Sequence, residues 1–373
     1  MSTIGSSSAP SFDTKYWDAL LSSTLDAYVA GGTMFDNIFK DSAYLAYMRL
    51  SDAVKKQDGG HRIALPLMYG DNSTIATHGG YDVIDTTPQD GMTTAFYEWA
   101  EVAGSISISR KEERQNAGEG RLLNLLESKL KQAEMTMKEK LNTDLVRGTV
   151  NTLTFVPDVS QGSGALGLLP LGYFLRKDNT TDPLVGGDVG NISNNSFSWW
   201  RNITAAADTA SADTGNSFAM NVTTYAGYKA ALRRMRNFCS RGSGGPPDLV
   251  VFNQVSYETY ENAIDVNQRY TNTKMADLGY DTLKLQGATC IWDEQVPDID
   301  NGTAAITNGT AFFINTKFYH LVIDSQTDVV TTPFVEPENQ TAKTAKILFM
   351  GNAAVSNLRK HGVLYGISQS IVS

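Results

Sequence analysis

The chain has 373 residues, enough to bury one large hydrophobic core or two smaller ones. Hydrophobic residues make up 41% of the chain and charged residues 19%, a composition that excludes intrinsic disorder. The formal net charge of −9 has the wrong sign for a protein that grips phosphate backbones whatever their sequence.

The sequence gives no sign of secretion, membrane insertion or a disulfide framework. The N-terminal residues MSTIGSSSAPSFDTK contain no cationic region followed by an apolar stretch, so they do not predict a signal peptide. The weakly charged stretch 159–175 is interrupted by glycine and proline and does not predict a spanning helix. Cys239 and Cys290 lie in a predicted helix end and a predicted apolar strand, where we expect reduced core thiols. We therefore expect synthesis in the cytoplasm and no contact with a membrane.

Residues 1–58 predict an apolar arm. Helical spacing recurs in its first part, at Trp17, Leu20, Leu21, Thr24, Leu25 and Tyr28. A second apolar cluster consists of Met34, Phe35, Ile38 and Phe39. A terminal segment with this aromatic content needs a surface to pack on, either its own body or a neighbouring molecule.

Residues 59–109 predict a long β-hairpin. Strand-like alternation occurs at 63–68 and again at 105–109, and turn signals such as Gly79-Gly80 lie between them. Pro66 cannot donate a backbone hydrogen bond, so its strand should lie at a sheet edge. A two-stranded hairpin of this length is marginal by itself, and we expect it to lie on another surface, which could belong to another subunit.

Residues 119–147 predict a long helix with one apolar face. The apolar positions fall three or four residues apart, at Leu122, Leu126, Leu130, Ala133, Met137, Leu141 and Leu145. Arg147 followed by Gly148 is a helix stop signal. At about 1.5 Å per residue, this helix is roughly 40 Å long.

The rest of the chain predicts loops followed by a region of mixed helix and strand. Residues 156–195 are rich in glycine, asparagine and serine and predict loops and short strands. Helices are predicted at 223–240 and 257–264, and buried strands at 248–253 and 283–292. Apolar segments toward the C-terminus predict a return to β-sheet, so the fold class is α+β.

No pattern in the sequence defines a catalytic site. Four histidines are scattered without the spacing of metal ligands, so we expect structural or surface roles, no metal and no cofactor. They are His61, His78, His320 and His361. The spacing of Gly162, Gly164 and Gly167 matches a dinucleotide fingerprint, but the proline and glycine that follow oppose the helix that must come next.

An acidic cluster follows the predicted strand 283–292. Its members are Asp293, Glu294, Asp298 and Asp300. Oxygen-rich loops can hold a hard cation, so this cluster is the place where a hydrolase site could lie. Its spacing differs from that of the twelve-residue calcium loop, and a solvated loop is the simpler interpretation.

A basic stretch and an aromatic pair complete the candidates. The basic residues are Arg233, Arg234, Arg236 and Arg241. They could meet RNA, DNA or the carboxylates of a neighbour, because arginine pairs with phosphate and carboxylate alike; the acidity of the whole chain favours salt bridges or solvation. Trp199 and Trp200 could stack on a sugar or a base, although core packing is the commoner use of tryptophan.

The order of these parts and several phrases of the sequence resemble the tailed-bacteriophage major capsid proteins with the Hong Kong 97-like fold. The phrases are VGGDVGNISNNSFSWWRN at 185–202, PDLVVFNQVSYETYENAI at 247–264, LQGATCIWDEQVP at 285–297, AFFINTKFYHLVI at 311–323 and LRKHGVLYGI at 358–367. The resemblance extends from Trp17 to Ile367, and its phrases are structural, without the specificity of a catalytic signature.

The resemblance implies a non-catalytic major capsid protein that self-assembles, through hexamers and pentamers, into the icosahedral head shell around double-stranded DNA. Its parts would be an N-terminal arm (1–58), an extended β-hairpin loop (59–109), a peripheral domain (110–202) with its spine helix (119–147), most of an axial domain (203–345), and C-terminal strands that return to the peripheral domain (346–373). The protein would reside in the virion after synthesis in the cytoplasm of a bacterial host.

The resemblance also implies partners. We expect other copies of the chain, a separate scaffolding protein and a portal, with a decoration protein left open, and DNA enclosed without sequence-specific binding. Candidate contacts between subunits are Trp17, Phe35, Arg62, Trp99, Arg110, Arg233, Arg234 and Arg236. Some members of that family weld subunits through a lysine of the extended loop, but no lysine lies between Lys56 and Lys111, so we expect no covalent cross-link.

Three other functions stay open on the sequence alone. The first is an encapsulin-type cellular compartment, whose shell shares the fold. The second is a hydrolase that uses the acidic cluster Asp293, Glu294, Asp298 and Asp300. The third is a monomeric binding protein that uses Trp199 and Trp200.

Overall fold

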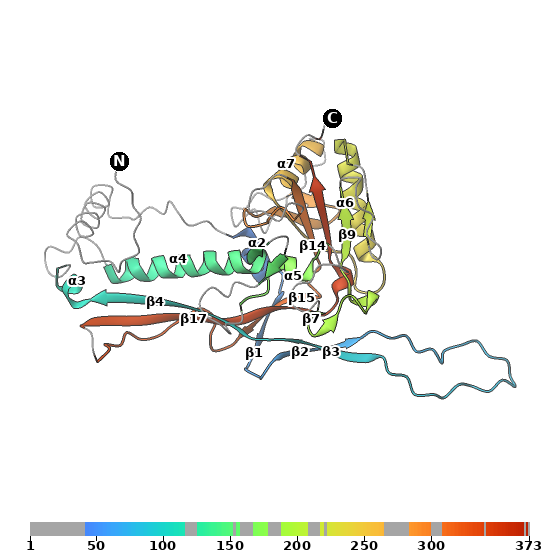
Figure 1. Ribbon diagram of the computed structural model, residues 1–373, viewed down its shortest axis with the longest axis horizontal. Coiled ribbons are helices and arrows are strands. Elements are labelled where there is room, and N and C mark those ends of the chain that lie inside the picture. Colours follow the sequence, from blue (N-terminus) through green and yellow to red (C-terminus); the bar gives the residue numbers. More distant parts are fainter. Residues whose placement is uncertain are drawn as a thin grey trace. The chain divides into compact units, whose positions relative to one another are not determined.

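The protein is described here from a computed structural model (Figure 1). The structure describes residues 42–115, 125–151, 154–156, 167–177, 188–207, 217–219, 222–264, 283–299, 308–338, 341–368 and 371. These residues divide between two compact units. The smaller unit contains Ala103–Met137 and Thr331–Ile347, and the larger unit contains Asp41–Val102, Lys138–Val330 and Leu348–Ser373. Three long elements contribute residues to both units: β4 (Ala100–Ser109), α4 (Leu125–Val146) and β17 (Ala342–Val355).

The larger unit is built on a seven-stranded mixed sheet. Its strand order is β10 (Ser217–Ala219), β9 (Ile203–Ala206), β18 (Gly362–Ile367), β14 (Gly309–Ile314), β11 (Leu249–Phe252), β13 (Ala288–Trp292) and β12 (Leu283–Leu285). β9 runs parallel to both of its neighbours and β11 runs parallel to β13, while the other pairs are antiparallel. Every residue of β9, β11, β14 and β18 is buried, so both faces of the central sheet are covered.

Two helices pack against one face of this sheet. α6 (Tyr225–Ser240) begins after Thr224, whose hydroxyl accepts a hydrogen bond from the Gly227 amide at 3.1 Å. α7 (Gln254–Ala263) begins after Asn253, whose side-chain oxygen accepts from the Ser256 amide at 3.1 Å and from the Thr310 amide at 3.0 Å. The same asparagine therefore caps α7 and hydrogen-bonds to the backbone of β14.

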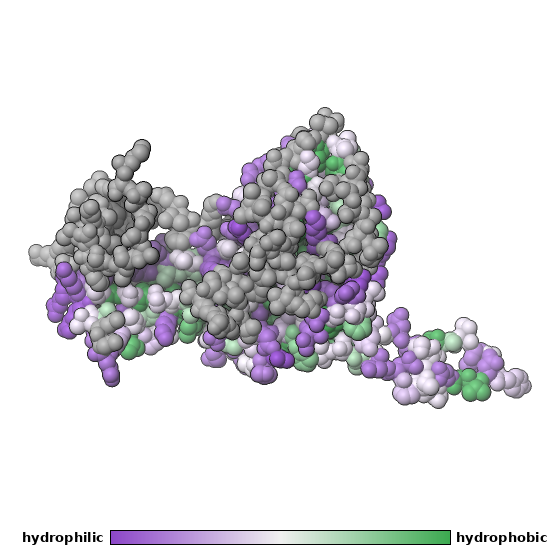
Figure 2. Space-filling model, viewed as in Figure 1, coloured by the Kyte–Doolittle hydropathy of each residue, from purple (hydrophilic) through white to green (hydrophobic). Residues whose placement is uncertain are grey.

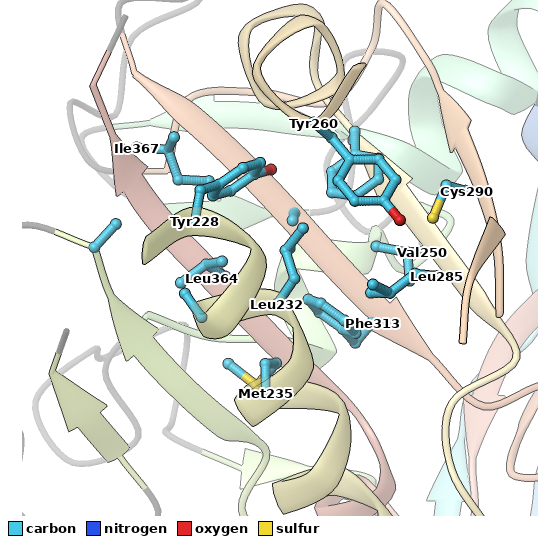
Figure 3. Close-up of a cluster of buried hydrophobic side chains, with 14 of the residues drawn as sticks. Tyr228, Leu232, Met235, Val250, Tyr260, Leu285, Cys290, Phe313, Leu364 and Ile367 are labelled. Carbon is cyan, nitrogen blue, oxygen red and sulfur yellow. The ribbon is translucent and has the colours of Figure 1, made fainter. Parts of the chain in front are cut away.

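The core of the larger unit lies between α6, α7 and the sheet (Figure 3). Tyr228, Leu232 and Met235, which are three or four residues apart on α6, point toward sheet side chains such as Phe313 and Leu364. All five side chains are buried. Both cysteines, Cys239 and Cys290, are buried in this core as free thiols.

The predicted strand 283–292 is a tight hairpin of β12 and β13, which corrects the expectation of one continuous strand. Gln286 and Gly287 both have positive φ, +48° and +93°, as a two-residue hairpin turn requires. The apolar run on both sides concealed this turn in the sequence.

A second sheet has five strands. β1 (Val54–Gln57) is parallel to β15 (Tyr319–Asp324), β15 is antiparallel to β17, and β16 (Val330–Thr331) and β4 also pair with β17. The predicted strand 105–109 is the end of β4, where Ile106 and Ile108 are buried and the residues between them are not. Its partner is thus β17, and the prediction that it closes a hairpin with 63–68 was wrong.

The hairpin strands are instead β2 (Ile63–Met68) and β3 (Met92–Tyr97), which form an antiparallel two-stranded ribbon (Figure 1). The register pairs Pro66 with Thr94 and Met68 with Met92. Within this ribbon, β2 pairs only with β3, so Pro66 lies on an edge strand as predicted.

The smaller unit joins α3 (Arg110–Gln115) to β4 and α4. The Glu112 amide donates to the Ser109 hydroxyl at 3.2 Å and the Ser109 amide donates to the Glu112 carboxylate at 3.0 Å, which is a capping box. The Lys129 amine of α4 donates to the same carboxylate at 3.1 Å and to the Ser107 carbonyl at 3.2 Å. The buried apolar side chains of the smaller unit include Ile106, Ile108, Met137, Ala345 and Ile347.

α4 ends at the predicted stop. The Gly148 amide donates to the Thr143 carbonyl at 2.9 Å, and Gly148 has a φ of +60°, which glycine adopts without strain. Met137, Leu141 and Leu145 are buried at four-residue intervals, as the apolar pattern predicted. The predicted start at residue 119 lies outside the described residues.

The remaining elements are short. They are α2 (Ala43–Leu50), β5 (Thr149–Asn151), β6 (Thr154–Val156), α5 (Leu171–Phe174), β7 (Asp188–Val189), β8 (Ile192–Ser193), η2 (Ser198–Trp200) and η4 (Leu358–Lys360). Among the described residues, none of the helices combines the length and the apolarity that crossing a membrane requires.

Candidate interface for assembly

The acidic cluster after β13 is partly buried, which corrects the expectation of a solvated loop. Asp293 is 6% exposed and Asp298 is 0% exposed. The Asn142 side-chain nitrogen donates to both carboxylate oxygens of Asp293, at 3.1 and 3.2 Å. The Asp298 carboxylate accepts from the Asn308 amide at 2.9 Å. These two carboxylates have structural partners because a buried charge without them is costly.

The Asp293 network joins α2 and α4 to the chain after β13. The Ser42 hydroxyl donates to the Asn142 side-chain oxygen at 2.6 Å and also accepts from the Leu45 amide at 3.1 Å, which caps α2. Burial raises the pKa of the Asp293 carboxyl, and hydrogen bonds from the Gln295 amide and from Asn142 oppose that shift.

The described members of the cluster do not form a metal site. Its other members are Glu294, which is exposed, and Asp300, which lies outside the described residues. In the part of the chain that the structure describes, no group of three or more His, Cys, Asp or Glu side chains could hold a metal ion. The described geometry therefore gives no support to a hydrolase site here.

The four histidines, all of them described, do not form a set of metal ligands. His61 and His78 are exposed. The Lys55 amine lies 3.0 Å from Nε2 of the buried His320, and burial, together with that lysine, lowers the pKa of His320 to about 4. Nδ1 of the buried His361 accepts from the Asn315 amide at 3.2 Å, and burial lowers its pKa to about 3. Both buried histidines are neutral structural groups at pH 7.

The two tryptophans of the WW pair have different environments. Trp200 is buried, and its indole nitrogen donates to the Val189 carbonyl at 2.9 Å. Trp199 is half-buried and stacks on Tyr69, the first residue after β2, with ring centroids 4.9 Å apart and planes 13° apart. Trp200 is therefore a core residue, as expected, while Trp199 supports the base of the hairpin.

The turn between β7 and β8 supports the hairpin from another side. The Phe96 amide of β3 donates to the Gly190 carbonyl at 3.0 Å. A Cβ at Gly190 would lie 3.0 Å from the Ala95 Cβ and from the Tyr97 ring, and Gly190 has a φ of +60°. Glycine is thus required here both by space and by conformation. The segment 188–200 anchors the root of the hairpin.

The β2–β3 ribbon is apolar on both faces. The inward face includes Ile63 (0% exposed) and Ala95 (0% exposed), so it is packed on the larger unit. We call the opposite face the outward face; it consists of Ala64, Pro66, Met68, Met92, Thr94 and Phe96. Met68 is 77% exposed, Met92 71% and Phe96 39%. A ribbon with water on one side ordinarily has polar residues there, so this face is suited to contact with another molecule.

The hairpin loop, residues 69–91, is exposed along almost its whole length. Figure 2 shows hydrophobic residues interspersed with hydrophilic ones on the surface of this segment. Exposed apolar side chains of the loop include Ile75, Tyr81, Val83 and Ile84. Local hydrogen bonds, such as the one from the Gly79 amide to the Asp82 carboxylate at 2.6 Å, shape the loop.

The contact candidates from the sequence have scattered positions. Arg62 pairs with Glu98 at 2.6 Å, and the Trp99 indole nitrogen donates to the Gly60 carbonyl at 2.9 Å, both near the base of the hairpin. Trp99 is only 9% exposed, so its role within this copy is packing. Arg110 is exposed in the smaller unit, and Trp17 and Phe35 lie outside the described residues.

The sequence predicted that the hairpin lies on another surface but did not identify the apolar outward face. The sequence does contain a signal, because apolar residues occupy both the odd and the even positions of 63–68. It can be interpreted only once 92–97 is identified as the partner strand.

The remaining contact candidates lie on α6, where Arg233 and Arg234 are exposed and Arg236 is half-buried.

The arrangement of these parts defines the fold. A mixed seven-stranded sheet with two helices on one face, the strands β4 and β17, the long helix α4 and an exposed hairpin together form the fold of the Hong Kong 97-like capsid proteins. The predicted α+β capsid fold is therefore confirmed.

Solved capsid structures share this fold at low sequence identity. The capsid protein of cyanophage A-1(L) is 12% identical with a TM-score of 0.58, and the match covers 90% of this chain and 95% of that chain. The capsid of Myoviridae phage XM1 is 13% identical with a TM-score of 0.53, again covering 90% of this chain and 95% of that chain. The capsid of a native GTA particle is 12% identical with a TM-score of 0.51, covering 90% of this chain and 93% of that chain. No protein-family model and no curated protein matches the sequence.

Proposed function

We propose that this chain is the major capsid protein of a tailed bacteriophage and that copies of it assemble into the icosahedral head shell around DNA. The fold it shares with the capsid proteins of phages A-1(L) and XM1 supports this proposal. At 12% and 13% identity the likeness concerns the fold, so the function is argued from the surfaces of this chain.

The outward face of the hairpin is the observation that carries the proposal. Met68, Met92 and Phe96 are exposed on the same face of the ribbon in a single copy. Full burial of a side chain such as methionine or phenylalanine is worth about 1.5–3 kcal/mol, so covering this face with a second copy would stabilise an assembly substantially. A monomeric protein would lose that stabilisation and gain a liability to aggregate.

In a shell, each single contact between neighbouring copies can be weak. Each copy in a closed shell repeats the same contacts with its neighbours, and multivalency makes the whole stable although single contacts are modest. In this proposal residues 1–58 form an arm, 59–109 the extended loop, 110–202 the peripheral domain, 203–345 most of the axial domain and 346–373 the returning strands.

The proposed role is structural, without catalysis. Asp293, Asp298, His320 and His361 each have a hydrogen-bond partner that serves the fold, as described above. The net charge of −9 suits a wall that encloses DNA without binding it tightly, because tight binding would hinder both filling and release. A separate scaffolding protein and a portal are the further partners in this proposal.

Electron microscopy and sedimentation of the purified chain, alone and with a scaffolding protein from the same genome, test the proposal. We expect large regular particles, with the scaffold required for uniform size. A compact single copy that persists at high concentration would contradict the proposal. Particles from the native host that contain an enzyme in place of DNA would favour the encapsulin-type compartment.

A further inference from the structure

The outward face of the β2–β3 ribbon ends in two methionines. The antiparallel register places Met68, the last residue of β2, directly opposite Met92, the first residue of β3. Opposed side chains in such a ladder have Cβ atoms about 4.5–5.5 Å apart, so the two thioethers are neighbours. Both side chains are largely exposed. We call these two residues the methionine pair.

The methionine pair contains the accessible sulfur atoms of the described residues. Of the other described methionines, Met48, Met137 and Met235 are buried, and Met135 and Met350 are half-buried. Both cysteines are buried, and burial raises the pKa of each thiol, so the reactive thiolate does not form at pH 7. An oxidant in solution therefore reaches the methionine pair before any other described sulfur.

Methionine is an uncommon residue for these two positions. Exposed strand positions usually have polar side chains, and apolar strand positions favour β-branched and aromatic ones. Leucine or valine would give the same apolar surface without a sulfur atom. What methionine adds is a thioether, which oxidation converts reversibly into a polar sulfoxide.

Building on the assembly proposed above, we infer that the methionine pair is an oxidation site that controls whether a free copy can enter the shell. The oxidant is a peroxide. The sulfur lone pair attacks one peroxide oxygen, the O–O bond breaks, a sulfur–oxygen bond forms and the second oxygen leaves as water when the oxidant is hydrogen peroxide. Each thioether is oxidised to a sulfoxide, and one peroxide molecule is reduced for each methionine.

Oxidation changes the outward face without disturbing the fold of a free copy. In a free copy, water solvates the sulfoxide oxygen. Among the neighbours on this face, Ala64, Pro66 and Phe96 have no side-chain donor for it, and Thr94 has one hydroxyl. A second copy that covers the face removes the water and leaves the sulfoxide short of hydrogen bonds, which is costly. Oxidised copies are therefore excluded from the shell.

The same geometry protects the finished shell. A methionine pair that a second copy covers is out of reach of the oxidant. Oxidation thus acts on free copies and spares assembled ones, so it regulates the supply of subunits and leaves existing particles intact.

Mapping of the oxidised residues is the first test. Free chains and assembled particles are treated with hydrogen peroxide, and sulfoxide is located by peptide mass spectrometry. In free chains we expect sulfoxide to form about tenfold faster at Met68 and Met92 than at Met48, Met137 and Met235. In particles the rate at the pair should fall roughly fivefold. Equal rates at all five methionines of a folded free chain would overturn the inference.

A leucine variant is the second test. Met68→Leu with Met92→Leu keeps the apolar surface but removes both sulfur atoms, so it should assemble as the wild type does before oxidation. After treatment of free chains with peroxide, the assembled fraction of the wild type should fall about tenfold and that of the variant by less than about twofold. The variant retains the methionines that lie outside the described residues, so it also separates their oxidation from that of the pair. They are Met1, Met34, Met220 and Met275.

A matched control and a polar variant complete the set. Met135→Leu with Met350→Leu removes two half-buried sulfur atoms and should remain as sensitive to peroxide as the wild type. Met68→Gln with Met92→Gln places a polar group on the face permanently and should lower the assembled fraction without any oxidant. Circular dichroism should show an unchanged fold for every variant and for the oxidised wild type.

Reversal by reduction is the third test. Methionine sulfoxide reductases A and B each reduce one epimer of the sulfoxide, so both are added together with a dithiol. The dithiol is oxidised to a disulfide and the sulfoxide oxygen leaves as water. Assembly of the oxidised wild type should return to within about twofold of the untreated level.

The outcomes distinguish the inference from the proposed function. If peroxide lowers assembly of the wild type and the leucine variant equally, or if a wild type with sulfoxide at both positions assembles normally, the inference is wrong and the proposed function stands. If the untreated wild type forms no particles, the proposed function fails and this inference fails with it.

Discussion

At the scale of single residues, buried polar side chains hold the larger unit together. Asn142 satisfies both oxygens of Asp293, and Ser42 in turn satisfies Asn142. A buried carboxylate that loses its donors pays the full desolvation penalty, so such chains are sensitive to single changes. The sequence placed Asp293 in an exposed loop because nothing in its neighbourhood reveals a donor 151 positions away.

Replacing Asn142 by leucine tests this network. The variant keeps the branched shape of the side chain but removes the Asn142 donor from the buried Asp293 carboxylate, so we expect a loss of about 2–3 kcal/mol in the free energy of unfolding. Urea denaturation should show a lower midpoint at an unchanged slope. Asn237→Ala, on the exposed side of α6, should change the free energy by less than about 0.5 kcal/mol. An equal effect of both changes would contradict the assigned role.

The neutral histidines predict a dependence of stability on pH. The folded pKa values of about 4 for His320 and about 3 for His361 lie below the usual 6.5. Below pH 6.5 the unfolded chain binds a proton at each histidine while the folded chain does not, so stability falls as the pH decreases from 6.5 toward 4. Each histidine contributes a slope of about 1.4 kcal/mol per pH unit in that range.

Urea midpoints at pH 7, 6 and 5 measure this slope, and His320→Gln isolates one contribution. The variant should lose less stability between pH 7 and pH 5 than the wild type. The raised pKa of Asp293 has the opposite effect on stability. A carboxyl whose pKa is raised in the folded state makes the folded protein more stable as the pH falls. A comparison of variants is therefore more informative than the wild-type curve. Parallel curves for both proteins would refute the assignment to His320.

At the scale of elements, the hairpin is defined by its root and by its two faces. The Gly190 carbonyl of the β7–β8 turn accepts a hydrogen bond from the Phe96 amide of β3, and Trp199 stacks on Tyr69 where β2 ends. These supports explain why a two-stranded ribbon, which is marginal alone, is held in place.

Gly190→Ala should loosen the root. The new methyl would meet Ala95 and Tyr97 at 3.0 Å and would need a positive φ, so we expect a loss of about 1–3 kcal/mol. Gly287→Ala is the matched control, because Gly287 also has a positive φ but no atom within 4 Å of the added Cβ. That control should cost only the conformational strain, about 1 kcal/mol. Thermal unfolding of both variants distinguishes crowding from strain.

The two faces of the ribbon should respond differently to substitution. Met68→Ser with Met92→Ser on the outward face should leave the stability of the isolated chain within about 0.5 kcal/mol but lower the yield of particles. Ile63→Ala on the inward face should destabilise the isolated chain by about 2–5 kcal/mol, because Ile63 is 0% exposed. Light scattering and urea denaturation measure the two effects. Normal assembly of the serine variant would argue against the outward face as an interface.

The element predictions succeeded where the signal was local. The end of α4, the helix α6 and the strands β2 and β11 follow from caps, periodicity and turn residues close in sequence. The predicted strand pairing was wrong. β4 pairs with β17, which is far away in the sequence, and β3 is the partner of β2. Alternation within a strand identifies a half-buried strand but not its partner.

At the scale of the whole molecule, the proposed shell depends on non-covalent contacts. No lysine lies in residues 57–110, so the loop cannot form an isopeptide bond to a neighbour through a lysine of its own. Particles boiled in detergent should therefore migrate as a single band at the mass of one chain. A ladder of oligomers would contradict this prediction and would call for a search for another covalent link.

The sequence by itself determined the class of fold, because the order of an apolar start, an alternating segment, a long amphipathic helix and a mixed C-terminal half is carried by local periodicity. Only the tertiary structure decided which strands pair and that Asp293 and Asp298 are buried. It also decided that Trp199 supports the hairpin while Trp200 packs in a core, and that the outward face of the ribbon is exposed in a single copy. The physical reason is that burial and pairing depend on residues far apart in the chain. Their energies are set by which surfaces meet, and no short stretch of sequence records that.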